Sequence, residues 1–194
     1  MIIVMAKGIT LSFLFYGFLF LGLSATVYPP KLIAAPAPGG MGIGPVCPPA
    51  CPPNPANCDA NLVITPTQDL QFGSIIAPVA GTGSVIVDTG GNPTPTGGVL
   101  LIGAGTTAAI FSMSTGPFNC TGRVINTITV GPTATLTHAS LPATMTVHTF
   151  TTNPAQGGAF DPAVPLTVGA TLDVGAFQTP GSYSGTYLVT VTFQ

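Results

Sequence analysis

Charge is what this sequence lacks most. Only 4% of its 194 residues are charged: three are basic, five are acidic, and all five acids are Asp. An ordinary soluble domain is about 25% charged. With so few cations, no basic stripe can neutralise phosphates, which argues against nucleic-acid binding. With no Glu at all, the chain also lacks the heptad chemistry of coiled coils and helical bundles.

The sequence is not short of apolar residues. Hydrophobic residues make up 46% of the chain, although it contains no Trp, and Gly 25 and Pro 21 are abundant. Disordered chains combine low hydrophobicity with high charge, and this chain has the opposite balance. The length suits one domain of ordinary size.

Residues 1–35 are predicted to be an export leader. Lys7 is the only charge before the apolar run from Ile9 to Leu23, which is shorter than the ~20 residues that span a bilayer. A basic start followed by such a run is typical of a signal peptide, and small residues place cleavage within 25–37. The alternative is an uncleaved anchor. In either case we expect export to the periplasm, cell surface or extracellular space, with membrane contact only through the leader.

The four cysteines support export, because an even number in an exported chain indicates disulfides. We prefer Cys58–Cys120, which ties the front of the domain to its middle. This pairing leaves Cys47 and Cys51 as a small local loop or as intermolecular thiols. The competing interpretation is zinc, because three of these thiols cluster, but zinc sites more often show CxxC pairs or supporting His.

Two further segments follow the leader. Residues 36–60 are rich in Pro and are predicted to be an extended linker. Residues 61–194 form the predicted domain, with short apolar runs separated by Gly, Pro and Asn. Strict alternation is clearest at 166–174 and 183–193, and eight weaker strands are predicted at 62–65, 70–76, 84–88, 99–102, 108–114, 124–130, 133–138 and 144–150. This pattern predicts an all-β, immunoglobulin-like sandwich.

No pattern of catalytic residues is evident, so we expect no enzyme, no cofactor and no metal. Gly103 and Gly105 imitate a dinucleotide-binding fingerprint, but no helix is predicted after them, and we expect a turn between two strands. His138 and His148 are predicted to lie about 13 Å apart on a hairpin, too far to chelate one metal. Asp88 and Asp161 look like turn residues whose carboxylates bond local backbone.

The domain resembles a known bacterial family. The opening "D-L-x-F-G" at Asp69–Gly73 and the ending "P-G-x-Y-x-G-x-Y-x-V-x-V" from Pro180 resemble domain of unknown function 4402, over about residues 62–194. That family is similar to spore-coat-U and chaperone–usher pilin domains. Pilin subunits resemble this ending, with Gly where Gly181 stands and a penultimate aromatic residue, which here is Phe193 rather than the usual Tyr.

The resemblance implies a sandwich that lacks its last strand, which a periplasmic chaperone fills first. A neighbouring subunit's N-terminal extension then replaces the chaperone strand, after delivery to an outer-membrane usher, and builds a fibre from copies of this chain or related subunits. This is β-strand addition. The residues implied for this assembly strand are Gly181, Tyr183, Tyr187, Val189, Val191 and Phe193.

The donor segment must alternate apolar residues near the mature N-terminus. Met41 and Ile43 alternate with Gly, but Pro45 follows, and Pro cannot donate to a ladder. Residues 36–46 are therefore either a donor strand or a spacer.

Two functions follow from these patterns. The first is a structural subunit of a surface fibre (fimbria) or coat. The second is a self-complete, exported immunoglobulin-like module that binds or adheres without polymerising. A strand before Asn61 that pairs with 183–193 in the same chain would weaken the first.

Overall fold

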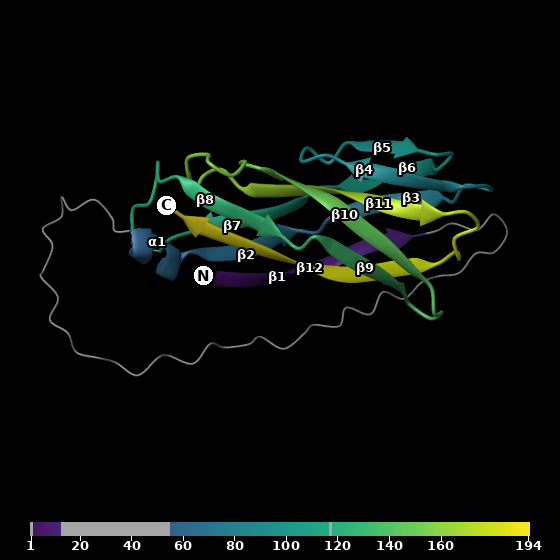
Figure 1. Ribbon diagram of the computed structural model, residues 1–194, viewed down its shortest axis with the longest axis horizontal. Helices are drawn as coiled ribbons and strands as arrows, with labels where there is room; N and C mark the ends of the chain where they lie inside the picture. Colours follow the sequence, from purple (N-terminus) through teal and green to yellow (C-terminus); the bar gives the residue numbers. More distant parts are fainter. Residues whose placement is uncertain (1, 13–54, 117) are drawn as a thin grey trace, which may run out of the picture. The chain divides into compact units, whose positions relative to one another are not determined.

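The fold is known from a computed structural model that describes residues 2–12, 55–116 and 118–194 (Figure 1). Its elements in chain order are β1 (Ile2–Ser12), α1 (Pro55–Asn61), β2 (Val63–Gln68), β3 (Gln71–Ile76), β4 (Thr82–Val87), β5 (Pro93–Thr96), β6 (Leu100–Thr107), β7 (Ala109–Ser114), β8 (Ile125–Val130), β9 (Thr133–His138), β10 (Thr144–Asn153), β11 (Leu166–Gly175) and β12 (Ser182–Phe193).

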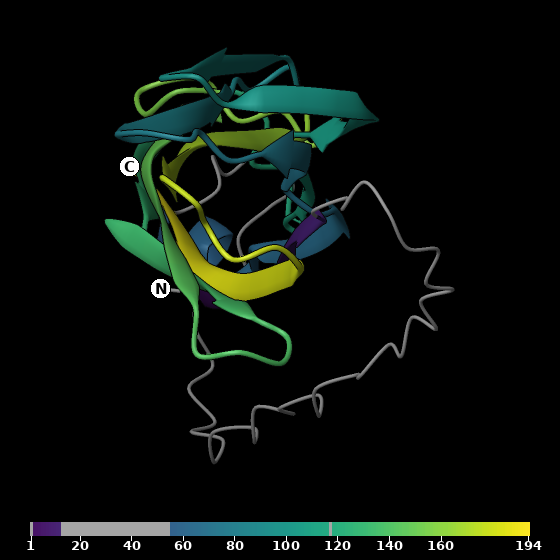
Figure 2. The ribbon, with the colours of Figure 1, turned by 90° about the vertical axis from the view of Figure 1, so that its right-hand side faces the viewer.

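All twelve strands belong to one hydrogen-bonded network. Its main path runs β2-β7-β11-β10-β9-β12-β1-β3-β6, while β4 joins β11 to β5, and β8 pairs with β12. The pairs are antiparallel, except that β1 and β3 run parallel. The strands curl around a shared interior, as Figure 2 shows, in a sandwich-like all-β fold. The expected fold class is therefore confirmed.

Alternation of apolar and polar residues builds the core, because successive side chains of a strand point to opposite faces. In β12 the buried positions fall at Tyr183, Tyr187, Val189, Val191 and Phe193, with exposed or half-buried residues between them. β11 shows the same pattern from Leu166 to Val174. The largest fully buried side chains are Tyr183, Phe72, Phe111, Phe160, Leu62, Leu70, Ile75, Ile125, Leu136 and Leu166.

The ten strands predicted from the sequence all occur, with ends that move by a few residues. β9 and β10 form the predicted hairpin, in which Thr144 pairs with Thr137 and His148 with Thr133. Asp88 also behaves as predicted: its Oδ1 accepts hydrogen bonds from the backbone N–H groups of Gly90 (2.9 Å) and Asn92 (2.8 Å). Hydrogen bonds from Asn92 are the main cause that lowers the pKa of Asp88.

Three elements were not predicted. One is β1, which lies in the segment expected to be an export leader. The linker was expected to be extended, but its last part forms α1, which Pro55 opens. Pro is tolerated there because the first turn of a helix leaves its N–H groups unbonded. β5, with the sequence Pro-Thr-Pro-Thr, lies in none of the predicted strands, yet it pairs with β4 as an edge strand, where Pro is allowed.

Candidate functional site

The last strand, β12, is the candidate site, and it has partners on both flanks. One flank pairs with β8 and β9. The other flank pairs antiparallel with β1, from Ile2 opposite Val191 to Ser12 opposite Ser182. β1 also pairs with β3, so it bridges two strands that do not pair with each other in the described sheet. We call the position between β12 and β3 the β1 groove.

The occupant of the β1 groove bears on the two functional hypotheses. A strand before Asn61 does pair with β12 in the same chain, which is the feature that favours a self-complete module. That strand, however, comes from residues 2–12, within the predicted leader. The predicted donor residues Met41 and Ile43 lie outside the described residues, as do Cys47 and Cys51.

Three edge strands of the described sheet, β2, β5 and β6, carry features that hinder strand addition. β5 contains two Pro residues, β2 contains Pro66, and β6 holds Gly103 and Gly105 at positive φ. Pro lacks a donor, and irregular glycines bend an edge out of register. β12 has neither Pro nor a charged residue.

The turn expected at Gly103 and Gly105 is wrong. Both residues lie inside β6, beside a register shift in its pairing with β3.

The loop before β12 is held by two side chains of the sheet. Backbone N–H groups of Ser140 (3.0 Å) and Leu141 (2.9 Å) donate to Nδ1 of His138. The ring proton therefore sits on Nε2, which donates to the carbonyl of Pro180 at 3.0 Å. The Tyr183 hydroxyl donates to the Thr179 carbonyl at 2.7 Å. These bonds fix the entry of the chain into β12.

Gly181 has a structural reason to be glycine. Its φ is 147°, and a Cβ there would overlap the His138 ring. That ring also stands edge-on to Tyr183, with centroids 4.9 Å apart. The position therefore excludes a larger residue, which explains the glycine whether or not it takes part in assembly.

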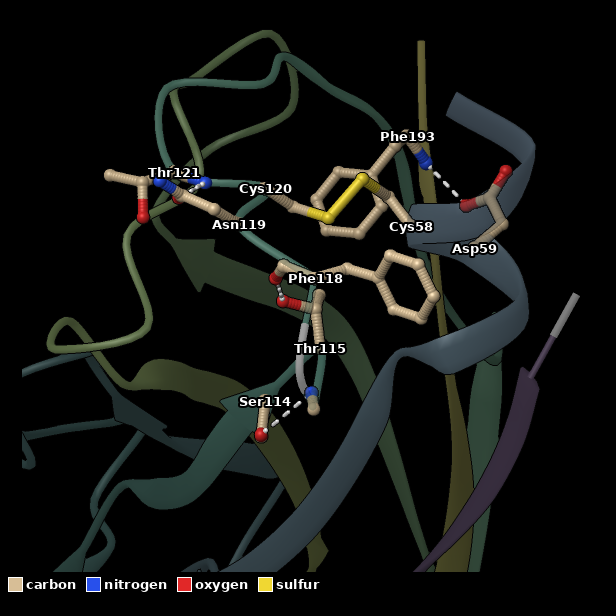
Figure 3. The surroundings of a disulfide bond; sticks show 10 residues. Cys58, Asp59, Ser114, Thr115, Phe118, Asn119, Cys120, Thr121 and Phe193 are labelled. Atoms are coloured by element: carbon tan, nitrogen blue, oxygen red, sulfur yellow. Dashed lines mark hydrogen bonds between the residues drawn. A yellow bond between two sulfur atoms is a disulfide. The ribbon is translucent and has the colours of Figure 1, made fainter. Parts of the chain in front are cut away.

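The opposite end of β12 lies beside α1, which a disulfide ties to the loop between β7 and β8. Cys58 of α1 forms a disulfide with Cys120, the pairing preferred from the sequence (Figure 3). With Cys58 in this bond, the alternative zinc cluster loses a thiol. Beside it, the Phe193 N–H donates to Oδ1 of Asp59 at 2.7 Å, and the Phe193 ring packs edge-on against Phe160.

Tyr187 has an unusual environment inside the core. Its ring stacks on Phe150 with centroids 5.2 Å apart and meets Phe111 edge-on. Its hydroxyl is buried without a hydrogen-bond partner. Burial, and secondarily the charge of Asp69, raises the pKa of Tyr187 well above its usual value. A buried, unsatisfied hydroxyl costs about 1–3 kcal/mol.

The remaining polar groups offer little chemistry. His148 pairs with Asp173 across the β10–β11 ladder, at 3.0 Å, on a largely solvated face. A hollow of about 350 Å³ between β8 and β10 is lined by Thr side chains, Phe150 and Gln156, among others, and holds no charged residue. Among the described residues, no three His, Cys, Asp or Glu side chains gather as a metal site.

Sequence reasoning missed two residues of the site. Asp59 was not singled out, because it falls in the segment expected to be an extended linker. His138 was considered only as a metal ligand, but its ring lies against Gly181 and bonds Pro180. No local pattern indicated either contact, because Asp59 meets Phe193 and His138 meets Pro180 only through the fold.

Comparison with known proteins gives one match. A family model described as "Domain of unknown function (DUF4402)" matches residues 62–193. No curated protein matches the chain, and no solved structure does. Within the part of the chain that the structure describes, no helix is long and apolar enough to cross a membrane.

Proposed function

The chain belongs to the domain of unknown function 4402 family, and on that premise we propose that it is a non-catalytic structural subunit of a surface fibre or coat. Subunits join when an extended strand of one copy fills the β1 groove of the next. A periplasmic chaperone and an outer-membrane usher are the partners that such assembly would use.

One observation supports this proposal above the others: the strand in the β1 groove comes from residues 2–12. If these residues leave with the export leader, β12 and β3 lose their shared partner. Their exposed N–H and C=O groups then need a substitute, because unpaired strand edges recruit other strands. A strand from a second copy would supply main-chain hydrogen bonds along β12, and its alternate side chains would supply specificity.

The uncharged face of the groove suits such an exchange. β12 carries no charge from Ser182 to Phe193, and its outward residues are Ser, Thr and Leu. Small hydroxyl side chains are covered by a neighbouring chain at a much lower desolvation cost than ionised groups.

A second function remains the alternative because β1 pairs within the same chain. If residues 2–12 stay attached, the domain is complete and would act as an exported binding or adhesion module.

The mass of the surface protein separates the two functions. We expect intact-mass analysis of material sheared from cells that express the full chain to show loss of residues 2–12. We also expect unboiled samples to give SDS-resistant ladders that collapse on boiling. A monomer that retains residues 2–12 would overturn the fibre proposal and favour the self-complete module.

The donor segment needs a test of its own. Deleting residues 36–46 should abolish the ladder, as should the pair Met41→Asp and Ile43→Asp, because charges do not enter apolar strand pockets. The matched control, Met41→Leu with Ile43→Val, should assemble normally. Unchanged ladders in the deletion variant would remove residues 36–46 as the donor.

A further inference from the structure

An exposed apolar surface lies at the end of the domain where β12 begins. Val79, in the loop between β3 and β4, and Phe177, in the loop between β11 and β12, are each 78% exposed, the highest values among the large apolar side chains described. Ile76 and Leu100, which pair across β3 and β6, are exposed as well. We call these four residues the Phe177 surface. Figure 1 shows these loops at the opposite end of the sheet from α1.

Within the Phe177 surface, Phe177 itself has a strained backbone. Phe177 has a φ of 52°, a left-handed value that bulky residues rarely adopt. Its backbone N–H donates to the carbonyl of Pro78 at 3.0 Å, which joins the two loops. The chain thus holds a strained backbone and a solvated phenyl ring at one point. Such strain is typical of functional sites.

The direction of β1 identifies what would cover this surface. β1 enters the groove beside Val191 and leaves it beside Ser182, where the Phe177 loop joins β12. A strand from a second copy that runs in the same direction also leaves beside Ser182. The rest of that copy must then follow at this end of the domain.

The length of the linker keeps the two copies close. If Met41 and Ile43 fill the groove, the donor's own domain starts at Pro55. The segment from Ile43 to Pro55 spans at most about 43 Å when fully extended, at 3.6 Å per residue. The α1 end is therefore the part of the donor's domain that is tethered nearest to the Phe177 surface.

The α1 end carries a matching set of exposed apolar residues. Val63, Phe118 and Val124 are all exposed. They lie at one end because Val63 pairs with Ser114, the Phe118 N–H donates to Thr115, and the Val124 carbonyl accepts from Gln194. We call these three residues the α1-end surface.

We propose that, in the fibre, the Phe177 surface of one copy packs against the α1-end surface of the copy that donates its strand. This contact rests on the proposed function and adds its geometry: a head-to-tail interface between unlike ends, which extends into a filament rather than closing into a dimer.

Photo-crosslinking from position 177 tests the contact. Phe177 is replaced by p-benzoylphenylalanine in the full chain, expressed in cells that display the wild-type ladder. We expect crosslinks between two copies that map within the α1-end surface. Crosslinks to another face, to a different protein or to lipid would overturn the contact while leaving the ladder intact, and so would the absence of any crosslink. If the wild-type chain forms no ladder, the proposed function fails, and the contact fails with it.

A pair of variants separates assembly from folding. Phe177→Asn suits a left-handed backbone and removes the ring. We expect its monomer to unfold at the same denaturant concentration or a higher one, while its fibres are at least twofold shorter in electron micrographs. Val164→Ser, at an exposed apolar residue of another loop, should leave fibre length unchanged. Equal fibre lengths in Phe177→Asn and wild type would contradict the proposal.

Discussion

The two ends of β12 are secured by different physical means. At the end of the strand, the Phe193 N–H donates a hydrogen bond to Asp59 of α1, and a disulfide ties α1 to the loop between β7 and β8. At its start, the loop depends on hydrogen bonds from His138 and Tyr183 and on a close approach that only Gly181 permits. The comparison shows that a covalent bond lies near the end of β12, where the linker joins the domain. At the start of β12, near the exposed Phe177 surface, only noncovalent contacts hold the chain.

Removing the disulfide should have the largest effect on stability. Cys58→Ala with Cys120→Ala frees a loop with a sequence separation of 62, which corresponds to about 4 kcal/mol of chain entropy. Denaturant unfolding of the purified protein measures the change. Reductant should lower the wild-type midpoint and leave that of the double variant unchanged. A loss below about 1 kcal/mol would show that the disulfide end is no better secured than the other.

Gly181→Ala should have the next largest effect, at about 1–3 kcal/mol, because the new methyl group overlaps His138 at a φ that disfavours any side chain. Gly157→Ala is the matched control, with positive φ and nothing within 4 Å, and should cost about 1 kcal/mol. Adding His138→Ala to Gly181→Ala should recover part of the loss. Equal costs for the two glycine variants would refute the steric explanation.

Asp59→Ala should cost about 1–2 kcal/mol, because it leaves the Phe193 N–H without its charged acceptor. Asp59→Asn keeps an acceptor oxygen and should recover most of the stability in thermal unfolding. If the Asn variant is as unstable as the Ala variant, the charge rather than the hydrogen bond secures this end.

His148→Ala provides the baseline, since its pair with Asp173 lies away from both ends and is largely solvated. Exposed ion pairs contribute about 0–1 kcal/mol. We therefore expect an unfolding midpoint close to that of the wild type. A loss as large as that of Asp59→Ala would mean that mid-sheet contacts matter as much as those at the ends.

Strand identity was largely readable from the sequence. Apolar and polar residues alternate in β11 and β12 because each strand has one buried and one more exposed face. This pattern is local in the sequence, and the burial of the two strands follows it. The 3.6-residue repeat that marks longer helices could not reveal α1, which has only seven residues. β5 was missed because Pro usually signals a turn, and only pairing with β4 at a sheet edge makes it a strand.

The candidate site was predictable only in part. The buried positions of β12 followed from alternation, and the preference for Cys58–Cys120 rested on their positions along the chain. The contacts of Gly181 with His138 and of Asp59 with Phe193 join residues far apart in the sequence. Such contacts depend on strand order, which no local pattern specifies.

By itself, the sequence determined a charge-poor, all-β chain whose last strand alternates between core and surface, because charge and period are local properties of the residues. The tertiary structure alone decided that β12 and β3 do not pair with each other, and that residues 2–12 lie between them and pair with both. The physical reason is that backbone hydrogen bonds between strands can be satisfied by any suitable segment, so the partner is chosen by geometry rather than by sequence.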